Sequence, residues 1–236
     1  MPASPWVMTQ TWHDLLFAHW PIDPRQLRTK IPPAFELDTH DGQAWLGVVP
    51  FHMTNVGPRG IPALPWISAF PESNVRTYVR VGDRPGVYFF SLDAGSQVAV
   101  RAARTLLNLP YYPAAMTVDP RESGIAYHSQ REDASMAKMA AFTATYGPHG
   151  APFVATKGGL EYFLTERYCL YHLDHRGVPY RLEIHHPPWR LVPARALFVR
   201  NTMAEVNGIA LPDRAPLLHF VKRQDMVAWA PTSLRP

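Results

Sequence analysis

The sequence predicts a β-rich α+β fold with a strongly curved or barrel-like sheet. Many short segments of strand length carry apolar or alternating patterns, whereas few segments show helical spacing. Turns separate these segments, because 25 prolines and 14 glycines are spread along the 236 residues. With 47% hydrophobic and only 18% charged residues, the chain can bury a large core and is not intrinsically disordered. We expect one domain covering residues 1–236.

Three strands are predicted in the first half of the chain. Residues 44–53 follow an Asp-Gly turn and place apolar side chains at alternate positions. Residues 74–81 alternate more strictly, and a Gly-Asp turn connects them to the apolar run at 87–92. A run that is apolar at nearly every position is typical of a strand covered on both faces. These segments therefore predict a hairpin inside the fold.

The clearest helix is predicted at residues 96–107. Ser96 is its candidate N-cap, apolar residues recur at helical spacing, and a proline follows its end. Beyond it, residues 125–131 and 142–146 have strand patterns, and the segment around Lys138 is compatible with a helix.

The last third of the chain combines a short helix with paired strands. The helix is predicted near Leu160, after a Gly-Gly pair. Residues 168–173 and 180–186 flank a His-Arg-Gly turn and predict a hairpin. Residues 217–221 and 226–229 flank an Arg-Gln-Asp sequence and predict a final pair of strands.

Charge and targeting signals exclude several functional classes. The net charge is +4, but the basic residues form no stripe interleaved with aromatics, so we expect no nucleic-acid partner. No signal peptide is visible, and no apolar run approaches the roughly 20 residues of a membrane helix. Cys169 is the only cysteine, which excludes an internal disulfide and fits a reducing compartment. We expect a soluble, cytoplasmic protein without a membrane partner.

The short motifs of common cofactor-dependent and hydrolytic enzymes are absent. The dinucleotide-binding glycine motif, the P-loop, the serine-hydrolase elbow and the zincin motif do not occur. Two histidine pairs invite a metal interpretation, namely His172 with His175 and His185 with His186. Adjacent strand residues point to opposite faces, so the second pair cannot share one ion unless the strand ends there. We therefore expect neither a cofactor nor a metal.

The candidate site lies on the strictly alternating strand. Asn74, Arg76 and Tyr78 share one face, and Glu72 has the same parity. In an open sheet this face would be hydrated, whereas in a closed barrel it would line a pocket, and spacing alone leaves both interpretations open. Glu72 and Arg76 are about 13 Å apart along an ideal strand, which is too far for them to pair. A buried Arg76 therefore requires an anionic ligand or another carboxylate, for which Glu166 is the candidate.

Two further elements can contribute to this site. Arg101 and Arg104 lie about one helical turn apart, and they either face the site or are exposed to solvent. Tyr111 and Tyr112 are fixed between two prolines, and this rigid turn either presents both phenols to a cavity or packs them into the core. The residues leave these alternatives open.

Several segments together resemble the hallmark segments of the YqjF-like family, a domain of unknown function. They are residues 70–79 (FPESNVRTYV), 86–93 (GVYFFSLD), 109–112 (LPYY), 164–168 (LTERY) and 184–189 (IHHPPW), and the match extends from about Trp12 to Trp229. The family belongs to the acetoacetate decarboxylase-like superfamily. That resemblance implies a single domain built on a cone-shaped, partly closed mixed β-barrel with a few short helices and a small-molecule cavity.

The resemblance also implies expectations about chemistry. The superfamily's known enzymes form a Schiff base between a lysine and a keto acid. The nearest match to their lysine pair is Tyr111 and Tyr112, and a phenol cannot form an imine, so the sequence departs from decarboxylase chemistry. Among the four lysines of the chain, Lys157 is the least implausible replacement for the superfamily's imine-forming lysine. The superfamily's acidic pocket residue corresponds approximately to Glu72.

These observations predict a small-molecule-binding protein with a polar interior cavity for an anionic or carbonyl-bearing metabolite. In this hypothesis Arg76 neutralises a carboxylate, tyrosine hydroxyls donate hydrogen bonds, and Glu72 acts as an acid or base. The candidate catalytic residues are Glu72 and Tyr111, and the candidate ligand-binding residues are Asn74, Arg76, Tyr78, Arg104, Tyr112 and Glu166.

The residues leave open whether the protein is an enzyme. A lyase or isomerase that transfers protons without an imine is the leading interpretation, and a non-catalytic carrier or sensor is the alternative. A Schiff-base decarboxylase has less support. The same holds for an interaction module that uses exposed aromatics such as Trp66 and Trp189. The oligomeric state does not follow from the sequence.

Overall fold

The structure is a computed structural model that describes residues 2–61, 68–122, 124–132 and 139–234. Within these residues, 13 strands form one hydrogen-bonded sheet, so the predicted β-rich α+β class is confirmed. The strands are β1 (Met8–Ile22), β2 (Glu36–Leu37), β3 (Ala44–Pro58), β4 (Phe70–Val81), β5 (Arg84–Ala94), β6 (Tyr111–Arg121), β7 (Gly124–Arg131), β8 (Ala141–Pro148), β9 (Cys169–Leu173), β10 (Pro179–His185), β11 (Val192–Asn201), β12 (Leu217–Ala228) and β13 (Thr232–Ser233). The helices are α1 (Pro24–Arg28), α3 (Gln97–Leu107) and α4 (Leu160–Thr165), with a 3-10 turn at Glu205–Asn207.

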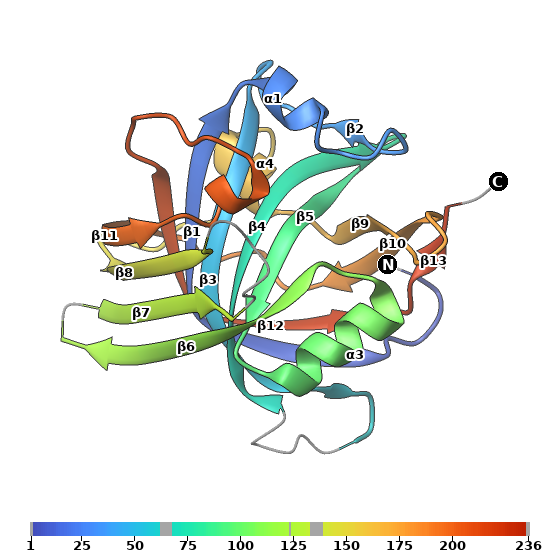
Figure 1. The fold of residues 1–236 in the computed structure, drawn as a ribbon, viewed down its shortest axis with the longest axis horizontal. Coiled ribbons are helices and arrows are strands. Elements are labelled where there is room, and N and C mark those ends of the chain that lie inside the picture. Colours follow the sequence, from blue (N-terminus) through green and yellow to red (C-terminus); the bar gives the residue numbers. More distant parts are fainter. Residues whose placement is uncertain (1, 62–67, 123, 133–138, 235–236) are drawn as a thin grey trace.

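The sheet closes on itself along two paths that share the strands β12, β1, β3, β4 and β5. On one path β6, β7, β8 and β11 connect β5 to β12 and complete a closed barrel of nine strands. On the other path β9 and β10 connect the same two strands, because β9 pairs with β5 and β10 pairs with β12. Figure 1 shows β7, β8 and β11 on one side of the molecule and β9 and β10 on the other. Both β6 and β9 run parallel to β5, which makes the sheet mixed.

The middle of the shared wall is therefore buried on both faces. Strand β4 shows how its two faces differ: Val75 and Val79 belong to the largest apolar core cluster. Glu72, Asn74 and Arg76 line a cavity on the opposite face. The alternation read from the sequence thus separates a packed core from a hollow space, and neither face of this stretch is hydrated as in an open sheet.

Helix α3 begins and ends with the local signals that predicted it. The Ser96 hydroxyl accepts a hydrogen bond from the backbone N–H of Ala99, which satisfies one of the free donors of the first turn. At the other end Asn108 adopts the left-handed conformation that commonly terminates helices. The helix lies against the end of the barrel near β6 (Figure 1). None of the described helices is both long and apolar enough to cross a bilayer.

One predicted feature near the C-terminus is wrong. Residues 217–229 do not form two strands around a turn, because β12 runs through them without interruption. Its register against β1 extends from Leu217, opposite His19, to Ala228, opposite Met8. Hydrogen bonds along the whole length of this ladder outweigh the weak local turn preference of the Arg-Gln-Asp sequence.

Sequence patterns missed several elements that complete the two closed paths. Strands β1, β6 and β11 were not predicted, and the rigid turn expected at Tyr111 and Tyr112 is the beginning of β6. The expected strands at 44–53, 74–81, 87–92, 125–131 and 142–146 and the hairpin at 168–186 are present, as is the short helix near Leu160. The segment around Lys138 lies outside the described residues.

The second closure depends on a close approach between β5 and β9 at Gly86. A Cβ added to Gly86 would lie 2.7 Å from the carbonyl oxygen of Cys169 and 2.7 Å from the ring of Tyr171. Contacts this short require the backbone to move, so only glycine fits where these strands meet.

We expect the variant Gly86→Ala to lower the free energy of unfolding by about 1–3 kcal/mol, because β9 must move away from β5. Gly57→Ala is the matched control, since the added Cβ meets nothing closer than 4.0 Å and no left-handed backbone is involved. Urea denaturation measures both. Equal stabilities of the two variants would contradict the close approach.

Candidate functional site

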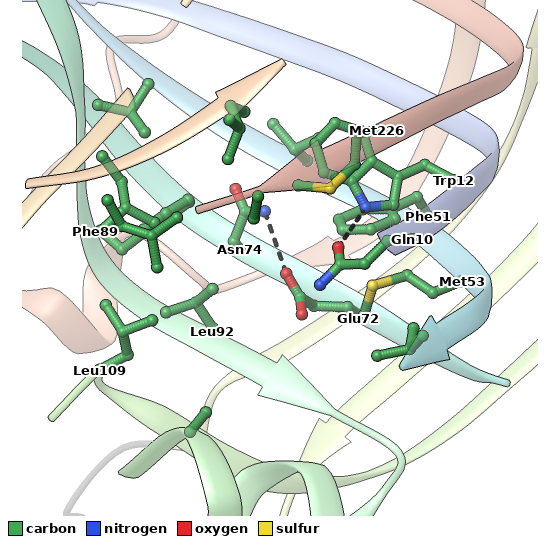
Figure 2. Close-up of a pocket in the computed structure, with 18 of the residues that line it drawn as sticks. Gln10, Trp12, Phe51, Met53, Glu72, Asn74, Phe89, Leu92, Leu109 and Met226 are labelled. Carbon is green, nitrogen blue, oxygen red and sulfur yellow. Dashed lines mark hydrogen bonds between the residues drawn. The ribbon is translucent and has the colours of Figure 1, made fainter. Parts of the chain in front are cut away.

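A cavity of about 280 Å³ lies between the shared wall and the strands β9 and β10. Side chains from β1, β3, β4, β5, β9, β10, β12 and α3 line it, and most of them are apolar. Figure 2 shows Trp12, Phe51, Met53 and Met226 on one side of this space, with Glu72 beside them. Of the polar row predicted on β4, Glu72, Asn74 and Arg76 therefore face this cavity.

Glu72 is the buried carboxyl group of this cavity, with only 3% of its surface exposed. Its Oε2 accepts a 2.7 Å hydrogen bond from the Tyr111 hydroxyl, and its Oε1 lies 3.5 Å from the donating Nδ2 of Asn74 (Figure 2). Burial raises the pKa of Glu72 from 4.5 to about 7, although both hydrogen bonds oppose the shift. The carboxyl group can therefore both hold and release a proton near neutral pH.

Two tyrosines on the barrel strands fix the position of Glu72. The hydroxyl of Tyr127 on β7 donates to the backbone carbonyl of Glu72 at 2.7 Å. Burial raises the pKa of Tyr111 well above its usual value, and the neighbouring Glu72 raises it further. Tyr111 consequently remains a proton donor throughout the range in which Glu72 titrates.

Arg76 lines the cavity together with Arg167, and its predicted partnership with Glu166 is not formed. Its Nη2 donates to the carbonyl of Leu164 at 3.3 Å, and its buried Nε has no hydrogen-bond partner. Among the described residues Arg76 has no ion-pair partner. Glu166 instead accepts from the Trp189 backbone N–H at 3.0 Å and from the Tyr168 hydroxyl. The two oxygens of Glu166 are therefore occupied by Trp189, which follows β10, and by Tyr168, which directly precedes β9.

Asn74 lies between Glu72 and Arg76 along β4 and also faces the cavity. Its side chain is buried, and its Oδ1 has no hydrogen-bond partner among the described residues. An unpaired buried acceptor carries a desolvation cost that a donor on a bound ligand would relieve. Together, Asn74 Oδ1 and Arg76 Nε offer one free acceptor and one free charged donor on the same wall.

Three other predicted site residues do not line the cavity. Tyr78 is fully buried, and its hydroxyl contacts the Leu164 carbonyl at 2.8 Å and His19 Nε2 at 2.7 Å. Tyr112 follows Tyr111 in β6 and therefore points away from it. Arg104 stacks over the Tyr112 ring at 5.2 Å.

The Tyr112 ring also contacts a buried ion pair. Arg131 lies 3.8 Å from the centre of the Tyr112 ring and forms a 2.6 Å salt bridge with the buried Asp93. Adjacent residues of one strand thus have different environments, because Tyr111 contacts the cavity carboxyl and Tyr112 packs on arginine.

Residues from unpredicted segments complete the cavity. Gln10 and Trp12 extend from β1, and the Trp12 indole N–H donates to Gln10 at 2.8 Å (Figure 2). Trp189 was expected to be exposed but is 2% exposed and stacks on Trp12 at 5.8 Å. Met8, Gln10 and Trp12 occupy every second position of β1 and all line the cavity. This spacing was the signal that could have revealed the strand. Trp66 lies outside the described residues.

The lysines and histidines supply neither an imine site nor a metal cluster in the described part of the chain. Lys30, Lys157 and Lys222 do not line the cavity, and Lys157 is exposed. Lys138 lies outside the described residues. No group of three or more His, Cys, Asp or Glu side chains gathers closely enough to bind a metal within the described ranges.

Comparisons with known proteins agree with this fold. Among solved structures, acetoacetate decarboxylase from Legionella pneumophila superposes with a TM-score of 0.66 at 14% identity, covering 100% of this chain and 92% of that one. The enduracididine biosynthesis enzyme MppR in complex with pyruvate gives a TM-score of 0.65 at 11% identity, with coverage of 100% and 92%. At these identities the likeness shows the acetoacetate decarboxylase-like fold.

Sequence similarity is much closer to one bacterial protein. The "Uncharacterized protein YqjF" of Bacillus subtilis (strain 168) is 48% identical over 229 residues, which cover 97% of this chain and 93% of YqjF. The family model DUF2071, described as "Uncharacterized conserved protein", matches residues 9–225. Because both matches extend along nearly the whole sequence, the chain belongs to the DUF2071 family of YqjF-like proteins.

Proposed function

We propose that this protein binds a small anionic or carbonyl-bearing metabolite in the cavity and moves a proton on it, as a lyase or isomerase does. The observation that carries the proposal is the buried Glu72 carboxyl group, whose pKa is raised to about 7 inside a mostly apolar cavity. Burial of this kind is how proteins adjust an acidic side chain for proton transfer near neutral pH.

The other polar groups of the cavity fit the same chemistry. Arg76 neutralises a carboxylate of the ligand, and Asn74 accepts a hydrogen bond from it. Glu72 removes a proton from the carbon next to a carbonyl group. The electron pair of the broken C–H bond forms a C=C bond, and the π pair of the carbonyl group moves to its oxygen, which gives an enolate. Returning the proton to a different position gives isomerisation, whereas loss of a leaving group gives elimination.

The fold comparison supports a cavity of this type without defining its ligand. MppR was solved with pyruvate bound, so a related barrel holds a small oxo acid. In this chain we propose a reaction without an imine, since Tyr111 faces the carboxyl group and no described lysine lines the cavity. The cytoplasmic location expected from the sequence stays a prediction.

A non-catalytic carrier is the second candidate, and the mostly apolar lining favours it. A carrier would bind the ligand without exchanging its protons. The two functions therefore separate in an isotope-exchange experiment.

We expect the protein to exchange the C3 protons of 2-oxobutyrate or 2-oxooctanoate with D₂O, followed by proton NMR. Glu72→Gln should slow this exchange by about 10²–10⁴-fold, because the amide cannot accept the proton. Binding, measured by titration calorimetry, should survive in this variant. Glu36→Gln on the exposed strand β2 is the matched control and should leave the rate unchanged. If the unmodified protein binds these ligands without exchanging their protons, the proposed enzymatic function is wrong and the carrier function takes its place.

The raised pKa of Glu72 also predicts a pH dependence of stability. Between pH 4.5 and about 7 the folded protein holds a proton that the unfolded chain releases, so the free energy of unfolding falls as the pH rises. Glu72→Gln removes this effect. The difference in the free energy of unfolding between Glu72→Gln and the unmodified protein should therefore change by up to about 3 kcal/mol between pH 5 and pH 8.

Urea denaturation at several pH values measures this difference, and Tyr111→Phe tests its cause. The Tyr111 hydrogen bond lowers the pKa of Glu72, so its loss should move the pH-dependent range upward. Parallel stability profiles of the unmodified protein and Glu72→Gln would show that the carboxyl group is not perturbed by burial.

A further inference from the structure

Three polar groups of the cavity lie on one strand, and most of the remaining lining is apolar. The other polar residues that line it are Gln10, Tyr111, Thr165, Arg167 and His186. Glu72, Asn74 and Arg76 all extend from β4. Opposite and beside them, Figure 2 shows aromatic and methionine side chains, including Trp12, Phe51 and Met226, with Phe89 and Leu109 toward the other end. The cavity therefore distinguishes one polar side of a ligand from a larger apolar remainder.

The size of the cavity exceeds what a very small oxo acid can fill. A volume of about 280 Å³ corresponds to about twenty water-sized spaces. A ligand as small as pyruvate would leave most of the apolar lining in contact with water. Each additional buried methylene group is worth about 0.8 kcal/mol, or a threefold to fourfold gain in affinity. A longer apolar body is thus strongly favoured by this lining.

Helix α3 forms the apolar wall with the smallest side chains. Ala99, Ala102 and Ala103 line the cavity, and their methyl groups leave space that larger residues would fill. Leu106 also lines the cavity while 77% of its surface is exposed, so the apolar wall continues to the protein surface at this end of the helix. Val98, in contrast, is exposed on α3 and does not line the cavity.

The charge of the cavity specifies the polar end of the ligand. The neighbouring Arg167 already forms a 2.7 Å salt bridge with Asp38, whereas Arg76 has a buried Nε without a partner and no ion pair among the described residues. The Arg76 guanidinium is also held over the Phe17 ring at 5.1 Å, which restricts its orientation. A planar carboxylate matches a fixed guanidinium better than a neutral hydroxyl or amide does.

We propose that the ligand is an amphipathic carboxylate with a medium-length alkyl chain or an aryl group, whose carboxylate binds Arg76 and whose apolar body lies along Trp12 and α3. This inference rests on the proposed function only for the placement of the ligand in this cavity. It does not require the ligand to react.

Titration calorimetry with butanoate, hexanoate, octanoate and 1-octanol tests the proposal on the full-length protein. Affinity should rise by on the order of a hundredfold from butanoate to octanoate. Octanol should bind at least about tenfold more weakly than octanoate, because it cannot form the charged hydrogen bond with Arg76. Equal affinity across the acids, or equal binding of octanol and octanoate, would overturn the proposal.

Two pairs of variants test the two ends of the ligand separately. Arg76→Gln should remove the preference for octanoate over octanol, whereas Arg80→Gln, at the exposed end of the same strand, should keep it. Ala103→Phe should weaken the binding of octanoate by at least about tenfold and leave the binding of butanoate unchanged, whereas Val98→Phe should affect neither. If Arg76→Gln does not fold, the comparison of octanoate with octanol on the unmodified protein still decides the question.

The outcome is independent of the proposed catalysis. A comparison of 2-oxooctanoate with octanoate shows whether the carbonyl group adds affinity. A strong increase of affinity with chain length, without proton exchange, would support this ligand class and contradict the proposed enzymatic activity. If 2-oxobutyrate exchanges its protons as fast as 2-oxooctanoate and binds as tightly, the proposed ligand class is overturned while the proposed enzymatic activity stands.

Discussion

The double burial of one sheet wall is the constraint on which the rest of the structure depends. Strands β12, β1, β3, β4 and β5 are shared by two closed paths, so each face of this wall must be covered. One face is covered by the packed apolar core and the other by β9, β10 and α3 around a cavity. Because the middle of the wall is buried, a polar group placed there is stabilised by a partner within the protein or on a ligand.

The partners inside the protein are incomplete, and this incompleteness defines the site. Glu72 is hydrogen-bonded to Tyr111 and held through its backbone by Tyr127. By contrast, Asn74 Oδ1 and Arg76 Nε are buried and lack partners. An unpaired buried polar group lowers the stability of the folded protein, and a complementary partner relieves this cost.

Tyr111 is central to the proposed chemistry. The resemblance placed Tyr111 where related enzymes carry an imine-forming lysine, and the structure brings this phenol to 2.7 Å from Glu72. A phenol cannot form an imine with a carbonyl carbon; under the proposed function, Tyr111 and Glu72 instead act as a proton-transfer pair. The same fold is thus compatible with chemistry that differs from decarboxylation through an imine.

The sequence by itself determined the local elements and the chemical character of the key strand. Alternation on β4 predicted that Glu72, Asn74 and Arg76 share one face, and the Ser96 cap located α3. Those signals are local, since they depend on side-chain periodicity and on hydrogen bonds within one turn. Family resemblance added the expectation of a barrel, which the structure confirms, and the role of Glu72, which stays a proposal.

Only the tertiary structure decided which predicted residues meet. It separated Tyr111 from Tyr112, satisfied Glu166 through Trp189 instead of Arg76, and joined residues 217–229 into one strand opposite β1. These outcomes depend on strand register and on the closure of the sheet between segments far apart in the chain. No local pattern encodes them, because the stabilising contacts exist only after distant strands have paired.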